Sequence, residues 1–113
     1  MKIKKFHIYY ADLNPRFGTE PGKIRPVVVI QTNLLNNIHP GTIICPVTTK
    51  TIKGIEYLRV SLNEKMNKLK QKSHILVDQI RTIDNRRLIG EIGKLSYKQK
   101  EKLLSNLKIL IFE

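Results

Sequence analysis

Two segments of the sequence carry polar side chains that could act together on an anionic group. Arg25 opens a β-branched run directly after a long loop, and Thr48 and Thr49 close a second apolar run before a basic turn. A guanidinium is a planar fork that can bind two oxygens of one phosphate or carboxylate, and a threonine hydroxyl can donate a further hydrogen bond. If the segments pair as neighbouring strands, these side chains meet on one rim. The other basic side chains expected on this rim are Lys23, Lys50 and Lys53.

Residues 73–84 form a third such segment, in which Ser73, Asp78 and Gln79 interrupt an apolar run. On the same rim they would add a hydroxyl, a carboxylate and an amide to the cations. The simpler interpretation of Arg25 is a solvated or ion-paired charge, and that of the threonines is strand propensity. Spacing alone leaves both interpretations open.

Other patterns associated with catalysis are absent from the sequence. It contains no glycine-rich phosphate loop, no H-E-x-x-H motif and no acidic cluster suited to Mg²⁺, so we expect no metal and no cofactor. The histidines, His7, His39 and His74, are scattered and are interpreted as polar surface or packing residues. The single cysteine, Cys45, lies in an apolar run, which favours a buried, inert thiol over a nucleophile.

Length and charge narrow the class of protein. The 113 residues suffice for one core, and we expect a single domain spanning residues 1–113. Lysine and arginine number 21 against 9 acidic residues, and the net charge of +12 favours a polyanionic partner such as nucleic acid or an acidic protein. No run approaches the ~18 apolar residues of a membrane span, and no apolar stretch follows the basic N-terminus as in a signal peptide. We therefore expect a cytoplasmic protein without a membrane partner.

Turn residues divide the first two-thirds of the chain into short strands. The expected strands are residues 8–13, 25–31, 42–48, 57–62 and 73–84. Residues 25–31 are apolar on both faces and predict a central strand. Strict alternation along the last strand would place Val77 and Gln79 on one face and Asp78 on the other. Residues 14–24 form a long loop of the kind that usually has a function, and residues 63–72 form a polar surface segment.

The hydrophobic period changes near the C-terminus. Ser96 and Gln99 form a capping box, and a leucine-rich arc of a helix follows. The members of this arc are Leu103, Leu104, Leu107, Leu110 and Ile111. Strands followed by a helix predict a mainly β fold, an antiparallel sheet or small barrel closed by a C-terminal α-helix. The apolar residues 109–112 could pack on the core or in a dimer.

Several motifs match one family of proteins. They are Tyr9-x-Ala11-Asp12-Leu13-Asn14-Pro15, Gly18-Thr19-Glu20-x-Gly22-Lys23-x-Arg25-Pro26, Pro46-x-Thr48 and Asp78-Gln79-Ile80-Arg81-Thr82-Ile83-Asp84. Through these motifs, which are spread over nearly the whole chain, the sequence resembles the MazF/PemK family of toxin endoribonucleases. Residues 50–54 and 63–72 match no motif of that family.

The resemblance implies a fold, an activity and partners. The fold is a small SH3-like antiparallel barrel of the MazF/PemK/CcdB type with an added helix, assembled as a two-fold homodimer. The activity is metal-independent, sequence-specific cleavage of single-stranded RNA, especially mRNA, by the toxin of a type II toxin–antitoxin system. The cognate antitoxin would lie across the dimer with an acidic, largely disordered C-terminal tail.

The resemblance also assigns residues. The family's catalytic arginine corresponds to Arg25 and its catalytic threonine or serine to Thr48. The family's substrate-contacting positions correspond to Phe17, Thr19, Glu20, Thr49, Asp78 and Gln79, and Lys53 of the basic rim is added to them as an RNA-binding residue. Phe17 is expected to stack on a base, and the polar side chains to contact base edges.

RNA can be cut without a metal because the substrate supplies the nucleophile. The ribose 2′-OH attacks the adjacent phosphorus, which leaves a 2′,3′-cyclic phosphate and a 5′-OH end. Arg25 is suited to neutralise the charge that develops, but a guanidinium with a pKa above ~12 is a poor base at neutral pH. Glu20 or a water molecule remains the candidate acceptor of the 2′ proton.

Two other functions stay open alongside the endoribonuclease. A non-nuclease toxin of the same fold could inhibit a protein target such as gyrase, although the presence of Arg25 together with Thr48 argues against it. A non-catalytic RNA-binding barrel would need only the basic charge.

Overall fold

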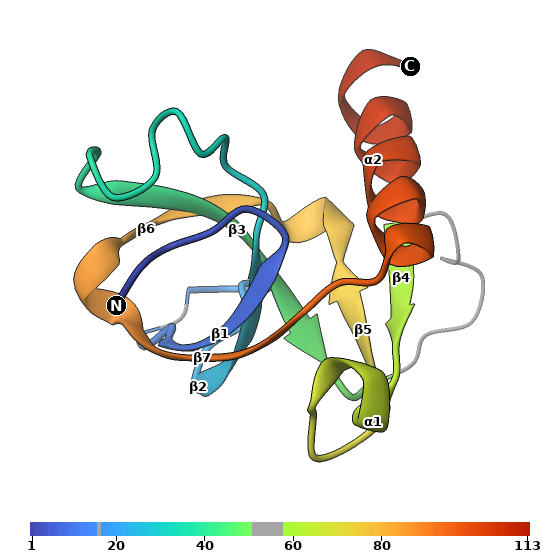
Figure 1. The fold of residues 1–113 in the computed structure, drawn as a ribbon, viewed down its shortest axis with the longest axis horizontal. Coiled ribbons are helices and arrows are strands. Elements are labelled where there is room, and N and C mark those ends of the chain that lie inside the picture. The colour runs from blue at the N-terminus through green and yellow to red at the C-terminus, as the bar shows by residue number, and fades with distance from the viewer. Residues whose placement is uncertain (16, 51–57) are drawn as a thin grey trace.

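The polypeptide folds into a twisted antiparallel sheet with a long C-terminal helix beside it (Figure 1). The computed structural model describes residues 1–15, 17–50 and 58–113. The strands are β1 (His7–Asp12), β2 (Ile24–Val29), β3 (Gly41–Thr48), β4 (Arg59–Leu62), β5 (Ser73–Leu76), β6 (Arg81–Asp84) and β7 (Leu88–Lys94). The helices are α1 (Glu64–Asn67) and α2 (Tyr97–Phe112), and two 3₁₀ turns, η2 (Val77–Gln79) and η3 (Asn85–Arg87), flank β6.

Strand β3 lies at the centre of the sheet and, in the described part of the chain, has three partner strands, on both of its edges. One edge pairs with β2, where Val28 lies opposite Cys45. The other edge pairs with β6 near the start of β3 and with β5 near its end. Strand β1 joins β2 to β7, and β4 extends the sheet beyond β5. The order is therefore β4-β5-β3-β2-β1-β7, with β6 as a second partner of β3.

The prediction of a mainly β chain with a C-terminal helix is confirmed, but the sheet does not close into a barrel. Within the described residues, the end strands β4 and β7 do not pair with each other. Helices lie between them instead. Gln99 of α2 donates a hydrogen bond to the Ser61 carbonyl of β4 (3.3 Å), and Asn67 of α1 donates one to the Lys94 carbonyl of β7 (2.8 Å). Side chains of α1 and α2 thus take the place of strand pairing.

Apolar side chains cover both faces of the central strands, as the sequence of β2 predicts. Val28 belongs to a buried cluster that includes Leu103 of α2. Val27 and Val29, which point the other way, belong to a second cluster with Tyr9. The sheet is therefore held from two sides, which fixes the ends of β2 and β3 relative to each other.

The single long strand predicted for residues 73–84 is wrong. The segment is divided into β5, the turn η2 and β6, all following one edge of β3. Val47 pairs with Ile75 but Ile44 pairs with Arg81, so the partner segment is longer than β3 over this interval. The 3₁₀ turn accommodates the extra residues. The alternation of side chains between the two faces of the sheet starts again after it. Its buried residue, Val77, packs into the same cluster as Leu103.

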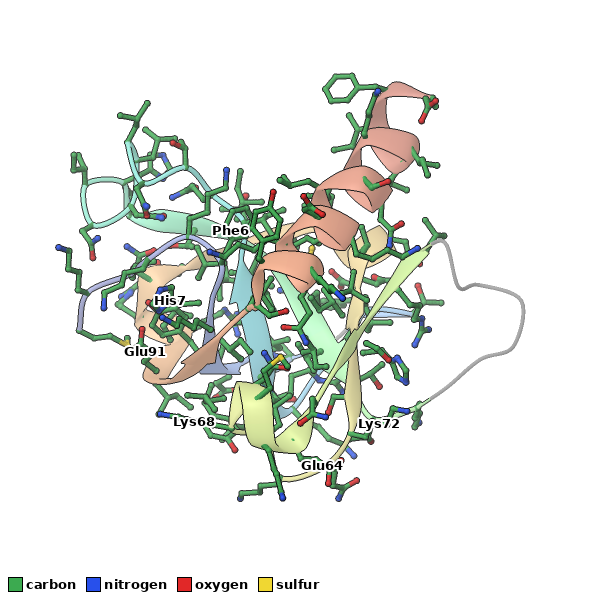
Figure 2. The ribbon with its side chains drawn as sticks, turned by 45° about the vertical axis from the view of Figure 1, so that its right-hand side comes forward. Phe6, His7, Glu64, Lys68, Lys72 and Glu91 are labelled. Carbon is green, nitrogen blue, oxygen red and sulfur yellow. The ribbon has the colours of Figure 1, made fainter. Side chains whose placement is uncertain are left out.

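Residues 63–72 are not the purely polar surface segment predicted from their composition. Asn63 caps α1, and Asn67 and Leu69 are buried. The Asn67 carbonyl oxygen lies so close to β7 that a Cβ at Gly93 would come within 2.6 Å of it, so only glycine fits there. Figure 2 shows Glu64, Lys68 and Lys72 at the end of the molecule where α1 lies. The buried amide therefore fixes a segment whose lysines point outward.

Helix α2 begins as predicted and ends with exposed apolar side chains. Ser96 accepts a hydrogen bond from the Gln99 backbone, and the Gln99 side chain accepts one from the Ser96 backbone, which completes the capping box. Leu103 is fully buried, but the apolar residues of the last turn are exposed. These are Ile109, Leu110, Ile111 and Phe112. No helix in the described ranges is long and apolar enough to cross a membrane.

Replacing Leu103 with alanine is expected to lower the free energy of unfolding by about 2–5 kcal/mol, because it removes a fully buried side chain between α2 and the sheet. Leu104→Ala is the matched control on the same helix, since Leu104 is 48% exposed, and it should change the free energy by less than about 0.5 kcal/mol. Equilibrium urea unfolding measures both. Equal losses in the two variants would contradict this packing of α2.

Candidate active site

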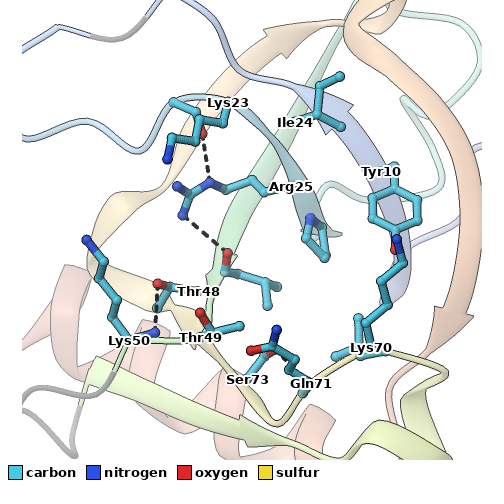
Figure 3. Close-up of a pocket in the computed structure, with 14 residues that line it drawn as sticks. Tyr10, Lys23, Ile24, Arg25, Thr48, Thr49, Lys50, Lys70, Gln71 and Ser73 are labelled. Carbon is cyan, nitrogen blue, oxygen red and sulfur yellow. Dashed lines mark hydrogen bonds between the residues drawn. The ribbon is translucent and has the colours of Figure 1, made fainter.

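A cavity of about 480 Å³ opens where β2 begins and β3 ends (Figure 3). One wall carries Lys23 and Arg25 from the start of β2 and Thr48, Thr49 and Lys50 from the end of β3. The rest of the lining includes Tyr10 of β1, Lys70 and Gln71 after α1, and Ser73 of β5, with Gln71 and Ser73 beside Thr49. The cavity is thus built from the two strands of the predicted rim and from the segment that α1 anchors.

Two hydrogen bonds hold Arg25 in the cavity wall. Its Nε donates to the Gly22 carbonyl (2.8 Å), and its Nη1 donates to the Val47 carbonyl (3.4 Å), both drawn in Figure 3. The first bond ties the guanidinium to the loop before β2, and the second ties it to β3 next to Thr48. The pairing of β2 with β3 therefore brings Arg25 and Thr48 into one cavity, as the sequence predicts.

Thr48 stands at the point where β3 leaves the sheet. Its neighbour Val47 is buried in the core, so the Thr48 side chain points to the other face of the strand. The Thr48 hydroxyl oxygen accepts a hydrogen bond from the Lys50 backbone N–H (3.2 Å). Because the oxygen accepts this bond, the hydroxyl hydrogen can be donated to a ligand in the cavity.

The long loop before β2 is closed at its base. The Leu13 N–H donates to the Lys23 carbonyl (2.9 Å), and the Lys23 N–H donates to the Asn14 side-chain oxygen (2.8 Å). Arg87 of the turn η3 donates further hydrogen bonds to the carbonyls of Asp12 and Asn14. These contacts fix the point at which the chain enters β2 and thereby the position of Arg25.

Several of the predicted RNA-binding residues do not line this cavity. Phe17, Thr19 and Glu20 lie in the long loop, where Phe17 is 72% exposed. Asp78 and Gln79 lie in the turn η2, so they are not on the strand that the sequence suggested. Of the predicted set, Arg25, Thr48 and Thr49 are brought together. Lys53 falls outside the described residues.

The sequence analysis did not single out Tyr10, Lys70 and Gln71. Tyr10 could have been found, because side chains alternate along β1 and Tyr10 therefore points to the other face of the strand from the buried Tyr9. Lys70 and Gln71 lie in a segment that matches no motif, and their position depends on Asn67 bonds between distant elements. The sequence predicts His74 as a polar surface or packing residue, yet it lies directly opposite Thr48 in the pairing of β3 with β5.

The cavity suits an anionic ligand. Its described wall contains the cations of Lys23, Arg25, Lys50 and Lys70 and no carboxylate. Cations on a concave surface of low dielectric raise the local concentration of anions. In the described ranges, no group of three or more histidine, cysteine, aspartate or glutamate side chains gathers as metal ligands do. The arrangement can therefore bind and orient a phosphate between a guanidinium and a hydroxyl.

The pKa values of two nearby side chains are displaced. Burial, together with the negative charge of Asp78, raises the pKa of the Cys45 thiol to about 12, so the thiol is protonated at neutral pH. Burial and the positive charges of Arg59 and Lys72 lower the pKa of His74 below its usual value. The imidazole of His74 is therefore neutral at neutral pH.

The fold and the site define a small antiparallel β protein with a cationic, hydroxyl-bearing cavity, and comparison with known proteins specifies its family. Residues 4–111 match the family model of PemK-like, MazF-like toxins of type II toxin–antitoxin systems. The chain is 36% identical over 109 residues to Endoribonuclease EndoA of Bacillus subtilis (strain 168), which covers 96% of this chain and 94% of that protein. The chain therefore belongs to the PemK-like, MazF-like toxin family, and the prediction of a toxin endoribonuclease is confirmed.

Solved structures agree on the fold. MazF of Deinococcus radiodurans superposes with a TM-score of 0.85 at 22% identity, covering 100% of this chain and 99% of that one. A MazE–MazF structure from the same organism gives a TM-score of 0.77 at 20% identity, covering 96% and 95% of the two chains. The arrangement of strands around the cavity is thus shared with MazF structures.

The Cys45 thiol is expected to be unreactive in the native protein. Because its pKa is raised to about 12, the nucleophilic thiolate is scarce at pH 8, and burial blocks access to the sulfur. Ellman's reagent should label the native protein at a rate limited by unfolding and label the urea-unfolded protein at once. Rapid labelling without denaturant would contradict the buried position of Cys45.

Proposed function

We propose that this toxin cleaves single-stranded RNA without a metal ion, by transfer of a phosphodiester to the neighbouring 2′-OH. The 2′ oxygen bonds to phosphorus, the bond to the 5′ oxygen breaks, and the products are a 2′,3′-cyclic phosphate and a 5′-OH end. The observation that carries the proposal is that Arg25 and Thr48 line one cation-walled cavity. A metal is not required, because the nucleophile belongs to the substrate and the protein need only align it and stabilise charge.

Arg25 is assigned the role of an electrostatic clamp on the scissile phosphate. Two of its nitrogens bind backbone carbonyls of the loop and of β3, so the guanidinium is held in place before the substrate arrives. A preorganised cation of this kind stabilises the transition state most strongly where negative charge develops. The phosphorane gains negative charge on its non-bridging oxygens, and the planar guanidinium can donate hydrogen bonds to two of them.

Thr48 is assigned the role of a hydrogen-bond donor to a non-bridging phosphate oxygen. Its own oxygen already accepts from the Lys50 backbone, which holds the hydroxyl at the cavity wall. The lysines of the cavity wall, Lys23, Lys50 and Lys70, would bind the flanking phosphates of the strand. The substrate is a single strand because its bases must be unstacked to reach reading side chains.

Base recognition is assigned to side chains at and beyond the cavity. Phe17 is exposed on the long loop and is suited to stack on a base. The polar residues proposed to contact RNA are Thr19, Glu20, Thr49, Lys53, Asp78 and Gln79. The residues that lie outside the cavity would contact nucleotides on either side of the cleaved bond. A bound strand several nucleotides long would extend from the cavity to these residues.

We further propose a homodimer and a protein antitoxin. The exposed apolar residues of the last turn of α2 support a dimer, since a cluster of this kind is rare on a monomeric surface. One related solved structure is a MazE–MazF complex, which supports an antitoxin partner. The +12 charge favours an acidic antitoxin tail that competes with RNA for the basic surface.

The decisive test is cleavage of a long single-stranded RNA in the presence of EDTA. The protein should cut the RNA at a defined sequence, and sequencing of the 5′ ends should show 5′-OH termini. A gyrase inhibitor would leave the RNA intact and slow DNA supercoiling, and a non-catalytic binder would bind the RNA without cutting it. Loss of cleavage in EDTA, restored by a divalent metal, would contradict the metal-free mechanism.

A 2′-deoxy substitution at the scissile nucleotide is the matched control for the nucleophile. This substrate should bind with nearly unchanged affinity, because its phosphates are intact, but should not be cleaved. Cleavage of the substituted substrate would exclude attack by the 2′ oxygen.

Substitution of Arg25 tests the clamp. Arg25→Ala should reduce the cleavage rate by about 10²–10³-fold, the effect of losing one preorganised donor in a transition state. Arg25→Lys keeps the charge but loses the fork, so it should recover only a small part of the lost activity. Single-turnover rates with a short RNA measure both variants, and nearly full activity of Arg25→Lys would disprove bidentate binding.

A further inference from the structure

The pairing of three strands places His74 beside Thr48. Thr48 of β3 lies directly opposite His74 of β5, and His74 lies directly opposite Ser61 of β4. Residues opposite each other in an antiparallel sheet project to the same face, with Cβ atoms about 4.5–5.5 Å apart. The neighbouring row in the same strands, Val47 and Ile75, is buried in the core. The row that contains Thr48 and His74 therefore faces away from the core.

The surroundings of His74 orient its ring and keep it uncharged. Its Nδ1 lies 3.5 Å from the Ser61 hydroxyl on the side of β4, away from β3. The charged groups that act on it are the cations of Arg59 in β4 and Lys72 before β5. Arg59 also donates a hydrogen bond to the Lys50 carbonyl after β3 (3.1 Å). Burial and the charges of Arg59 and Lys72 lower its pKa. A neutral imidazole has one nitrogen that can accept a proton at neutral pH.

The proposed cleavage needs such an acceptor, and no side chain of the described cavity wall can serve as one. The described wall contains no carboxylate, and Glu20 lies in the loop outside it. Arg25 and the lysines are protonated at neutral pH and cannot serve. His74 is not among the residues that line the cavity, but its register position opposite Thr48 places its side chain on the same face of the sheet, beside the hydroxyl proposed to bind the phosphate.

We infer that His74 is the general base of RNA cleavage in this protein, an inference that rests on the proposed function. With Nδ1 directed to Ser61, Nε2 takes the proton of the 2′-OH as the 2′ oxygen bonds to phosphorus. The bond from phosphorus to the 5′ oxygen breaks, and the 5′ oxygen takes a proton from water. The imidazolium then loses its proton to solvent, which returns the enzyme to its starting state. The neighbouring cations favour that loss.

The pH dependence of single-turnover cleavage tests the inference. In the wild-type protein the rate should rise with pH to a plateau, with a midpoint below ~6.5, because the base must be deprotonated and its pKa is lowered. His74→Gln should be slower by about 10²–10⁴-fold on the plateau. The plateau itself should disappear, since hydroxide must replace the imidazole and the rate then rises by about tenfold per pH unit.

His39→Gln is the matched control, since His39 hydrogen-bonds to Gly41 at the start of β3, the end of that strand away from Thr48. It should keep the wild-type rate and profile. The melting temperature of His74→Gln and its affinity for the 2′-deoxy RNA should equal those of the wild type. Added imidazole should partly restore cleavage by His74→Ala, with the pH dependence of free imidazole.

The outcomes separate this inference from the function on which it rests. Absence of cleavage by the wild-type protein would overturn the proposed function. Cleavage by His74→Gln with an unchanged plateau and midpoint would overturn the role of His74 and leave the endoribonuclease intact. A slower His74→Gln that keeps the wild-type midpoint would also overturn it, because a purely structural effect lowers the rate without changing the titrating group.

Discussion

The pairing of β2 with β3 is the interaction on which the site depends. Arg25 and Thr48 are distant in the sequence, and they share a cavity because Val27 and Val28 pair with Pro46 and Cys45 two and three residues further into the sheet. The backbone carbonyl of Val47 then accepts a hydrogen bond from Arg25 itself. The same apolar residues that bury β2 on both faces therefore fix the distance between a cation and a hydroxyl. The packing of the core therefore also determines the geometry of the site.

The position of β3 explains why so many of the polar groups gather near one strand. It pairs with β2 on one edge and with β5 and β6 on the other, so its end is next to residues from several parts of the chain. Thr48 lies in the cavity wall, Arg25 approaches from β2, and His74 approaches from β5. The cations that surround them make the local potential positive. This potential attracts an anionic substrate. Burial, together with the charges of Arg59 and Lys72, lowers the pKa of His74.

The sequence predicts those parts of the fold that depend on local pattern. The apolar run of β2, the capping box at Ser96 and the change of period before α2 are all properties of neighbouring residues, and they are confirmed. The division of residues 73–84 was not predictable in this way. The segment contains no proline or glycine that would mark a break, and the turn η2 arises because β5 and β6 must both follow β3 with different registers. The open sheet likewise depends on side-chain contacts of Asn67 and Gln99 with strands far away in the sequence.

The residues of the site divide in the same way, into those that sequence motifs identify and those that only tertiary contacts bring to the cavity. Arg25 and Thr48 are recognisable because family motifs surround them, and the structure brings them together. Lys70 and Gln71 are not recognisable, because nothing in their neighbourhood signals a cavity and only tertiary contacts bring them to its wall. The sequence alone predicts His74 as a polar surface or packing residue, because a lone histidine in a strand or loop usually has one of these roles. Its proximity to Thr48 follows from the register of two strands, which periodicity does not determine.

The attachment of the α1 segment through Asn67 has a consequence for how such a protein can diverge. The buried amide binds the Lys94 carbonyl and Gln99, and the absence of a side chain at Gly93 admits the Asn67 backbone, while Lys68, Lys70 and Gln71 remain exposed. Exchanges at the exposed positions leave the anchor and the hydrophobic interior untouched, so they carry little penalty in stability. Selection can thus alter one side of the binding cleft while the rest stays constant. A single scaffold of this kind is able to acquire new nucleotide preferences through a few surface mutations.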